Sequence, residues 1–172
     1  QAWTGSRALG LDDDRARRIT VELLEAAGAR GMVGGQALDL MAEERELDVE
    51  EVADLHAMKT GALLSAAPAM GGLAAGGDER VVEAFRTYGK ELGLAFQIAD
   101  DVLDATSSAA ALGKEPSDEV LAKSTYVSRL GVDEARERAR SRSEAAREAL
   151  EGAGLASPLL DNLAGYVVRR RM

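Results

Sequence analysis

The sequence predicts an all-α fold in a single domain, residues 1–172, and three observations lead to this prediction. Alanine, leucine, arginine and glutamate are abundant while aromatic residues make up only 3% of the chain, a composition that favours helices over strands. Apolar residues recur at helical spacing, and no useful stretch alternates apolar and polar residues as a half-buried strand would. Residues typical of helix ends punctuate the chain. We therefore expect a bundle of six or seven helices.

The first segments are helices opened by acidic residues. Residues 12–14 are all Asp and complement the positive N-terminal end of a helix. The glycine pair at 34–35 either interrupts a helix or lets another one approach closely. Asp48 with Glu51 resembles a capping box, which predicts a helix that continues through Leu63.

The middle of the chain contains one long helix between two turns. The segment "AMGGLAAGGDER" at 69–80 is typical of a helix end, a loop and a new N-cap at Asp78. We expect the next helix to run from about Val81 to Asp104. The segment "SSAAALGKEPSD" at 107–118 is predicted to be a loop, with Ser117 as a candidate cap for a short helix.

Two helices complete the predicted bundle. Asp133 is expected to open the first, which ends near Gly152. Ser157 and Pro158 fit the N-cap and the first turn of the last helix, which leads into the terminal "RRRM".

Composition excludes several classes of function. The chain has no cysteine and one histidine, so a disulfide framework, a thiolate metal site and a histidine-cluster zinc site within one chain are excluded. The formal net charge of −9 argues against nucleic-acid binding. No apolar run is long enough to cross a bilayer, and no secretory leader is evident. We expect a cytoplasmic protein.

The stretch "GLAFQIADDVLDAT" at 93–106 points to chemistry. Its helix is apolar nearly all round, yet Gln97, Asp100, Asp101 and Asp104 fall on one side, behind a small Gly93. No lysine or arginine lies between residues 90 and 114. Because buried carboxylates without partners are costly, their positive partner must come from elsewhere in the chain or from solution.

Two answers remain open at this point. Distant lysines pair with the three acids in a salt-bridged or solvated stripe, or the acids bind a divalent cation. The apolar flanks favour the cation, and the hard oxygen ligands favour Mg²⁺. Lys59, Lys114 and Lys123 are the candidate partners for phosphate groups. Acids, Mg²⁺ and lysines together indicate a diphosphate site in a helical bundle.

These motifs resemble the C-terminal half of the trans-isoprenyl diphosphate synthases, which make farnesyl and geranylgeranyl diphosphate. "GLAFQIADDVLD" is similar to the family's second aspartate-rich motif, and "HAMKTGALL" to its Lys-Thr motif at Lys59 and Thr60. "MVGGQALDL" resembles the segment that carries the family's pocket residues, here Gln36 and Asp39. "LGK" followed by "DEVLAKSTYVSRLG" matches two family lysines, and "YVVRRR" the basic C-terminus.

The resemblance implies an isoprenoid-synthase helical fold and a Mg²⁺-dependent prenyltransferase that joins an allylic diphosphate to isopentenyl diphosphate. It implies metal ligands at Asp100, Asp101 and Asp104. The other implied site residues act on the substrate: Gln36, Asp39, Lys59, Thr60, Gln97, Lys114, Lys123 and Arg171. It also implies a homodimer.

The resemblance covers half of such an enzyme. The family's first aspartate-rich motif is absent, and "DDDRARR" at 12–18 does not replace it because Ala16 stands where the motif has Asp. We therefore expect half of a metal site and no condensation by this chain alone. Two alternatives stay open: a non-catalytic partner subunit of a complete synthase, and a terpene cyclase, which the lysine spacing disfavours. A helix 92–105 with one apolar flank exposed would promote self-association.

Overall fold

Helices are the only regular secondary structure in the parts of the chain that the computed structural model describes, residues 10–42, 46–112 and 125–170. For residues 108–112 only the backbone is described. The helices are α2 (Asp13–Ala27), α3 (Met32–Ala42), α4 (Val49–His56), the π-helical turn η1 (Ala57–Gly61), α5 (Ala62–Ala74), α6 (Glu79–Leu112), α8 (Tyr126–Leu130), α9 (Val132–Glu151) and α10 (Pro158–Arg169). The predicted all-α fold class is confirmed.

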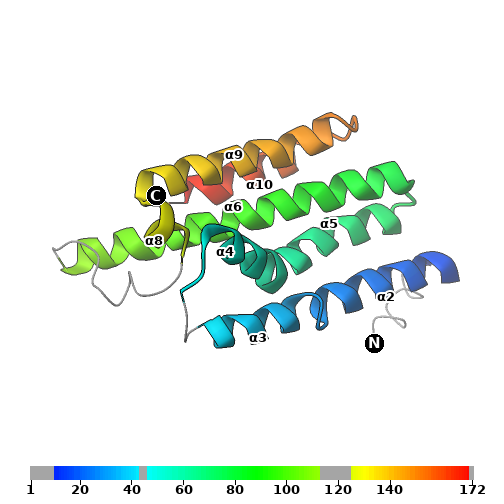
Figure 1. Cartoon of the computed structure of the whole chain (residues 1–172). Coiled ribbons are helices and arrows are strands. Elements are labelled where there is room, and N and C mark those ends of the chain that lie inside the picture. The colour runs from blue at the N-terminus through cyan, green and yellow to red at the C-terminus, as the bar shows by residue number, and fades with distance from the viewer. Residues whose placement is uncertain (1–9, 43–45, 113–124, 171–172) are drawn as a thin grey trace.

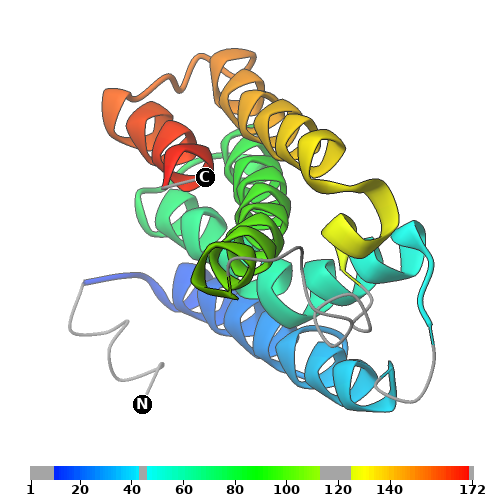
Figure 2. The same ribbon diagram turned by 90° about the vertical axis from the view of Figure 1, so that its left-hand side faces the viewer.

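Helix α6 is the central element of the bundle. Figure 1 shows α9 and α10 along one side of α6, α5 along the other, and α2 with α3 on the far side of α5. Viewed after a quarter turn, α6 lies in the middle with the other helices around it (Figure 2). Its neighbours therefore come from both ends of the sequence.

Three apolar clusters form the core, and α6 contributes to each. Val82 of α6 packs with Ala69 and Leu73 of α5. Further along α6, the second cluster joins it to α9 and α10 through Tyr88, Leu92, Ala95, Ala146, Leu150, Ala164 and Val167. The third joins it to α4, α8 and α9 through Ile98, Val102, Ala105, Val52, Leu55, Tyr126, Ala135 and Ala139. The apolar flanks of the acid-bearing stretch are thus largely buried, so the exposed flank that would promote self-association is not found in the described part of this helix.

Helix ends largely follow the sequence signals. Asp12 accepts a hydrogen bond from the Arg15 amide at the start of α2, and Asp78 does the same for Val81 at the start of α6. The predicted capping box before α4 is present, with both of its hydrogen bonds. These side chains satisfy amides that the first turn of a helix leaves without partners.

Two helix ends differ from the prediction, and one expected capping hydrogen bond is missing. Helix α6 continues to Leu112, because alanine and leucine favour helix in part of the segment predicted to be a loop. The short helix α8 is capped by Thr125 in a capping box with Ser128, while Ser117 lies outside the described residues. Ser157 precedes α10 as expected, but its side chain makes no capping hydrogen bond.

Small residues bring the helices that carry candidate site residues close together. A Cβ atom added at Gly35 of α3 would lie 2.3 Å from the amide nitrogen of Lys59. One added at Gly93 of α6 would lie 3.1 Å from the Cα atom of Gly61. The pair at 34–35 therefore allows close approach and does not interrupt α3. Turn η1 lies between α3 and α6.

Replacing Gly35 with Ala tests this close contact. We expect Gly35→Ala to destabilise the fold by roughly 1–3 kcal/mol, because the new methyl group meets backbone atoms that must shift. Gly71→Ala is the matched control: Gly71 lies within α5, and nothing lies within 4 Å of a Cβ added there, so it should stabilise by up to about 1 kcal/mol. Urea denaturation measures both, and equal effects of the two substitutions would contradict the contact.

Candidate active site

The three aspartates of α6 differ in their exposure. Asp100 and Asp101 are half-buried, whereas Asp104 is exposed. The neighbouring Ile98, Ala99 and Val102 are fully buried. A simple solvated stripe therefore describes Asp104 alone, and the first two carboxylates need partners.

Burial and one backbone hydrogen bond set the environment of Asp101. Its Oδ2 accepts a hydrogen bond of 2.9 Å from the backbone N–H of Tyr126, at the start of α8. Burial raises the pKa of Asp101 to about 6; the Tyr126 hydrogen bond lowers it in part, and the charges of Asp104 and Asp100 raise it further. A nearby cation would stabilise the ionised form of this carboxylate.

Asp100 is paired with a cation from the end of the chain. The Arg170 guanidinium donates from Nη2 to Asp100 Oδ1. Its Cζ atom lies 4.3 Å from the centre of the Phe96 ring, and its Nε donates to the carbonyl of Val167. Arg170 thus links the C-terminal end of α10 to the acidic face of α6.

The sequence left two answers open for these acids, distant lysines or a divalent cation. Among the described residues, the structure brings an arginine and a backbone amide to them. Within the run of arginines at 169–171, only the register of α10 distinguishes Arg170, so the sequence alone offered no signal for it. The Tyr126 amide could not be found from side-chain chemistry at all.

Lys59 lies in the π-helical turn, beside Thr60. Its Nζ donates to Asp39 Oδ2 of α3 at 2.5 Å, and both side chains are about one-third exposed, at 34% and 36%. The structure therefore brings together two of the residues that the family resemblance implied. A π-helical turn inserts an extra residue into a helix and often marks a functional site.

The remaining predicted residues lie in several places. Thr60 and Gln97 are half-buried, on η1 and α6, while Gln36 is exposed on α3. Gly61, at the end of η1, packs on α6 at Gly93, and Gln97 follows one helical turn later, so η1 lies beside the helix that carries the acidic motif. The backbone of Lys59 faces Gly35 of α3. Lys114, Lys123 and Arg171 lie outside the described residues.

His56 is buried immediately before η1. Only 9% of it is exposed, its ring lies 5.6 Å from the Tyr126 ring between centroids, and its Nδ1 has no hydrogen-bond partner among the described residues. Burial lowers the pKa of His56 to about 4; the charge of Asp39 opposes this lowering, and the charge of Lys59 adds to it. The imidazole is therefore neutral at pH 7, and its contact with Tyr126 joins the lysine-bearing turn to the element that holds Asp101.

The donor set fits a hard divalent cation bound partly by other ligands. Carboxylate oxygens are the ligands that Mg²⁺ prefers, and the desolvated Asp101 would be stabilised by one. Among the described residues, no three acidic or histidine side chains lie close enough to hold a metal ion by themselves. This agrees with the usual Mg²⁺ site, in which one or two carboxylates combine with water and substrate phosphates.

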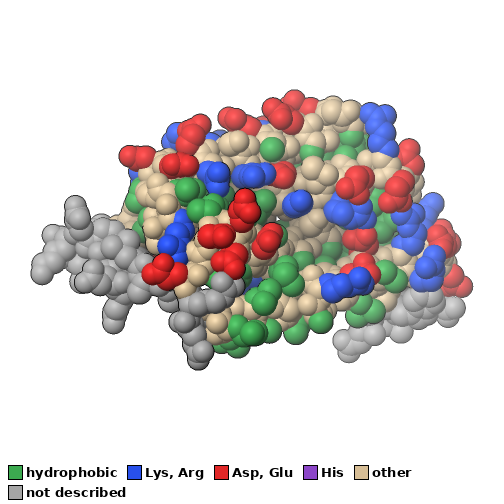
Figure 3. All heavy atoms as spheres, in the orientation of Figure 1, with side chains coloured by type: hydrophobic (Ala, Val, Ile, Leu, Met, Phe, Trp, Pro, Cys, Tyr) green, Lys and Arg blue, Asp and Glu red, His purple; other side chains and the backbone are tan. Residues whose placement is uncertain are grey.

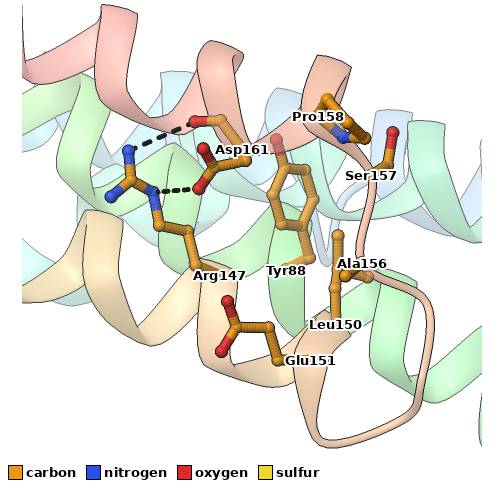
Figure 4. Close-up of a pocket in the computed structure, with 8 residues that line it drawn as sticks. All are labelled: Tyr88, Arg147, Leu150, Glu151, Ala156, Ser157, Pro158 and Asp161. Carbon is orange, nitrogen blue, oxygen red and sulfur yellow. Dashed lines mark hydrogen bonds and ion pairs between the residues drawn. The ribbon is translucent and has the colours of Figure 1, made fainter.

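A separate cavity lies away from the aspartates. It has a volume of about 440 Å³ and is lined by Tyr88, Arg147, Leu150, Glu151, Ala156, Ser157, Pro158 and Asp161 (Figure 4). Arg147 pairs with Asp161 at 2.8 Å, and Tyr88 donates to the carbonyl of Leu160. Since Tyr88 precedes Asp100 by 12 residues on α6, it lies about 18 Å away along the helix axis. The polar groups of this cavity join α6, α9 and α10 to one another.

Comparisons with known proteins show which sequences this chain resembles. A profile of the family described as polyprenyl synthetase matches residues 13–153. The chain is 41% identical over 164 residues to farnesyl diphosphate synthase of Escherichia coli, across 92% of this chain. It is 37% identical to geranylgeranyl pyrophosphate synthase 6 of Arabidopsis thaliana, across 96%.

Solved structures agree. The chain resembles an apo FPP/GFPP synthase from Zymomonas mobilis with a TM-score of 0.77 and 31% identity over 91% of this chain. It resembles a geranyltransferase from Helicobacter pylori, complexed with magnesium and isoprenyl diphosphate, with a TM-score of 0.73 and 31% identity over 92%. The chain spans about half the length of these relatives, between 51% and 54% of each.

None of the helices in the described parts of the chain is both long and apolar enough to cross a membrane.

The perturbed pKa values of His56 and Asp101 predict opposite pH dependences of stability. The folded-state pKa of His56, about 4, lies below its unfolded value of about 6.5. Protonation of His56 therefore favours the unfolded state, and the free energy of unfolding falls as the pH drops from 6.5 toward 4, by roughly 3 kcal/mol at most. The folded-state pKa of Asp101, about 6, lies above its unfolded value, so its ionisation destabilises the fold above pH 6, and this penalty disappears as the pH falls.

Urea denaturation of variants between pH 4 and 8 measures both effects as differences from the wild type. Asp101→Asn should be more stable than the wild type at pH 7 and lose that advantage as the pH falls through 6, since protonated Asp and Asn are both neutral. His56→Gln should gain stability relative to the wild type as the pH falls from 6.5 to 4. If both variants keep a constant difference from the wild type, these two pKa assignments are wrong.

Proposed function

Because the chain belongs to the polyprenyl synthetase family, we propose that it forms part of a prenyltransferase that condenses an allylic diphosphate with isopentenyl diphosphate to give a longer polyprenyl diphosphate. The observation that carries the proposal is the packing of turn η1, with Lys59, on the helix that bears the desolvated aspartates. A diphosphate bound between these two elements would meet a cation from the first and the metal-binding oxygens of the second.

Asp100, Asp101 and Asp104 would supply carboxylate ligands to Mg²⁺ in this proposal, together with water and the substrate phosphates. When bound, the ion would neutralise the negative charge of the diphosphate and favour its departure. Hydrogen bonding supports this role for Asp101, because the Tyr126 amide occupies one lone pair of Oδ2 and fixes the carboxylate. The Helicobacter pylori relative was crystallised as a complex with magnesium and isoprenyl diphosphate.

Lys59 would stabilise the leaving diphosphate. Heterolysis of the allylic carbon–oxygen bond sends its electron pair to the diphosphate, whose growing charge an ammonium group placed beside it would stabilise. Asp39 holds Lys59 in place until substrate competes for it. Lys114, Lys123 and Arg171 would contact the diphosphates as well.

The second half of the reaction needs an apolar setting. The double bond of isopentenyl diphosphate attacks the allylic cation, and loss of a proton completes the longer chain. Thr60 would accept that proton or steady the cation, while Gln36, Asp39 and Gln97 would line the pocket. The buried flanks of α6 would help to keep water from the cation.

We also propose a homodimer, located in the cytoplasm. Helices α2 and α3 support the dimer, because they expose large apolar side chains, including Leu24, Val33, Leu40 and Met41. Figure 3 shows apolar atoms gathered along this edge of the molecule, whereas charged residues of both signs are interspersed elsewhere on the same face.

A fusion protein tests the proposed activity. In it, this chain replaces the 164-residue region of the Escherichia coli farnesyl diphosphate synthase to which it is similar. We expect Mg²⁺-dependent release of pyrophosphate from the two substrates by the fusion and none by this chain alone. Lys59→Ala and Asp101→Asn in the fusion should each lower kcat by on the order of 100-fold or more, because each removes stabilisation of the developing charge.

Asp133→Asn is the control for a changed acid, since Asp133 is a fully exposed residue at the start of α9, and it should leave kcat unchanged. A fusion protein that folds, as judged by circular dichroism, yet releases no pyrophosphate would refute the proposal. If this chain instead alters the products of a complete synthase when added to it, the partner-subunit alternative is correct.

A further inference from the structure

The carboxylate of Asp100 already has a cation beside it. Arg170 pairs with this group, and the two side chains are 23% and 39% exposed, so water screens the pair only in part. The guanidinium also stacks on Phe96, 4.3 Å from the ring centre, which adds a cation–π attraction. A third contact, from Nε to the carbonyl of Val167, fixes the plane of the guanidinium.

These contacts place Arg170 in competition with a metal ion. Arg170 contacts Oδ1 of Asp100 and leaves other lone pairs of the carboxylate open, but the guanidinium and a metal ion at the same carboxylate repel each other. Binding of Mg²⁺ at Asp100 must therefore weaken the Arg170 contact, and the Arg170 contact must weaken Mg²⁺ binding by the same factor.

The position of Arg170 in the chain also allows its side chain to move away from Asp100. It is the residue that follows the last turn of α10, whereas the residues that anchor this helix, Ala164 and Val167, are buried in the core. Rotation of the Arg170 side chain, with its own backbone torsions, is enough to release Asp100. The packed part of α10 need not move.

We propose that Arg170 is an internal counter-cation that closes Asp100 in the substrate-free protein and is displaced when Mg²⁺ binds. The proposal rests on the proposed function, because it requires the aspartates of α6 to bind Mg²⁺. It makes the C-terminal end of α10 a sensor of metal occupancy. In the absence of metal, the Arg170 contact also neutralises a half-buried carboxylate that would otherwise be unpaired.

Calorimetric titration of the chain with Mg²⁺ alone tests the competition. Arg170→Met removes the charge and keeps an apolar stem over Phe96. Arg169→Met is the matched control, because it removes the same charge from the adjacent, exposed position. We expect Arg170→Met to bind Mg²⁺ more tightly than the wild type, by on the order of threefold to tenfold, the range expected for a partly exposed ion pair with a stacked arginine. Arg169→Met should change the affinity by less than about twofold, the part due to net charge.

Nuclear magnetic resonance of ¹⁵N-labelled arginine reports on the side chain directly. The Nε–H signal of Arg170, assigned by its loss in Arg170→Lys, should show the shift caused by the Phe96 ring in metal-free protein and lose it on addition of Mg²⁺. Asp100→Asn should weaken Mg²⁺ binding and reduce the ring-induced shift without metal.

Each outcome decides between the inference and the function on which it rests. If Asp100→Asn weakens Mg²⁺ binding but Arg170→Met and Arg169→Met change the affinity equally, the counter-cation is refuted and the metal role of the aspartates stands. An Arg170 signal that Mg²⁺ leaves unchanged also refutes it. If neither the wild type nor Arg170→Met binds Mg²⁺ at a site sensitive to Asp100→Asn, the metal role itself is wrong, and the inference fails with it.

Discussion

Carboxylates on a central, largely apolar helix cannot be neutralised by their own neighbours in sequence, and much of the structure around α6 meets this constraint. Its apolar residues bind α5, α9, α10 and the α4–α8 region into one core, which desolvates the acidic face as a consequence. The counter-charge and the hydrogen bond must then come from elements that the same packing brings close. The Tyr126 amide at the start of α8 serves Asp101, and Arg170 at the end of α10 serves Asp100.

The second requirement is a partly exposed cation on an element that packs against α6. Turn η1 places Lys59 at the surface between α3 and α6, paired with Asp39 only through a partly exposed contact. Glycines on both sides, Gly35 and Gly93, make room for the turn. His56 Nδ1 has no hydrogen-bond partner among the described residues, and the contact of its ring with Tyr126 connects this turn with α8. A site with a desolvated carboxylate, a partly exposed ammonium group and apolar walls suits chemistry in which charge separates.

Local signals in the sequence were enough to predict the fold class and most helix ends. Helix caps could be predicted because the capping side chain and the amide that it accepts from are only three positions apart in the sequence. This holds for the caps Asp12, Asp48 and Asp78. The extension of α6 to Leu112 was missed because a run of small residues has no cap signal, and its helix propensity was undervalued. The family resemblance itself is shown by the matched profile over residues 13–153.

The partners of the acids could not be predicted in the same way. Arg170 lies 70 residues from Asp100, and its identity depends on the register of α10 against α6. The sequence left open whether distant lysines or a divalent cation answer the acids. Among the described residues an arginine and a backbone amide contact them, Lys59 pairs with Asp39, and Lys114 and Lys123 lie outside the described residues. The close approach at Gly35 was one of two alternatives that the sequence left open, and only the packing of η1 on α3 decides between them.

The protonation of Asp101 is the most direct measure of whether α6 presents a desolvated carboxylate suited to a cation. Its side-chain ¹³C signal can be followed against pH in metal-free protein and again with Mg²⁺ and inorganic pyrophosphate. We predict a pKa of about 6 without metal and a clear fall when both are present, because a bound cation favours the ionised form. A pKa near the ordinary aspartate value of about 4 in metal-free protein, or one that Mg²⁺ and pyrophosphate do not move, would contradict the account.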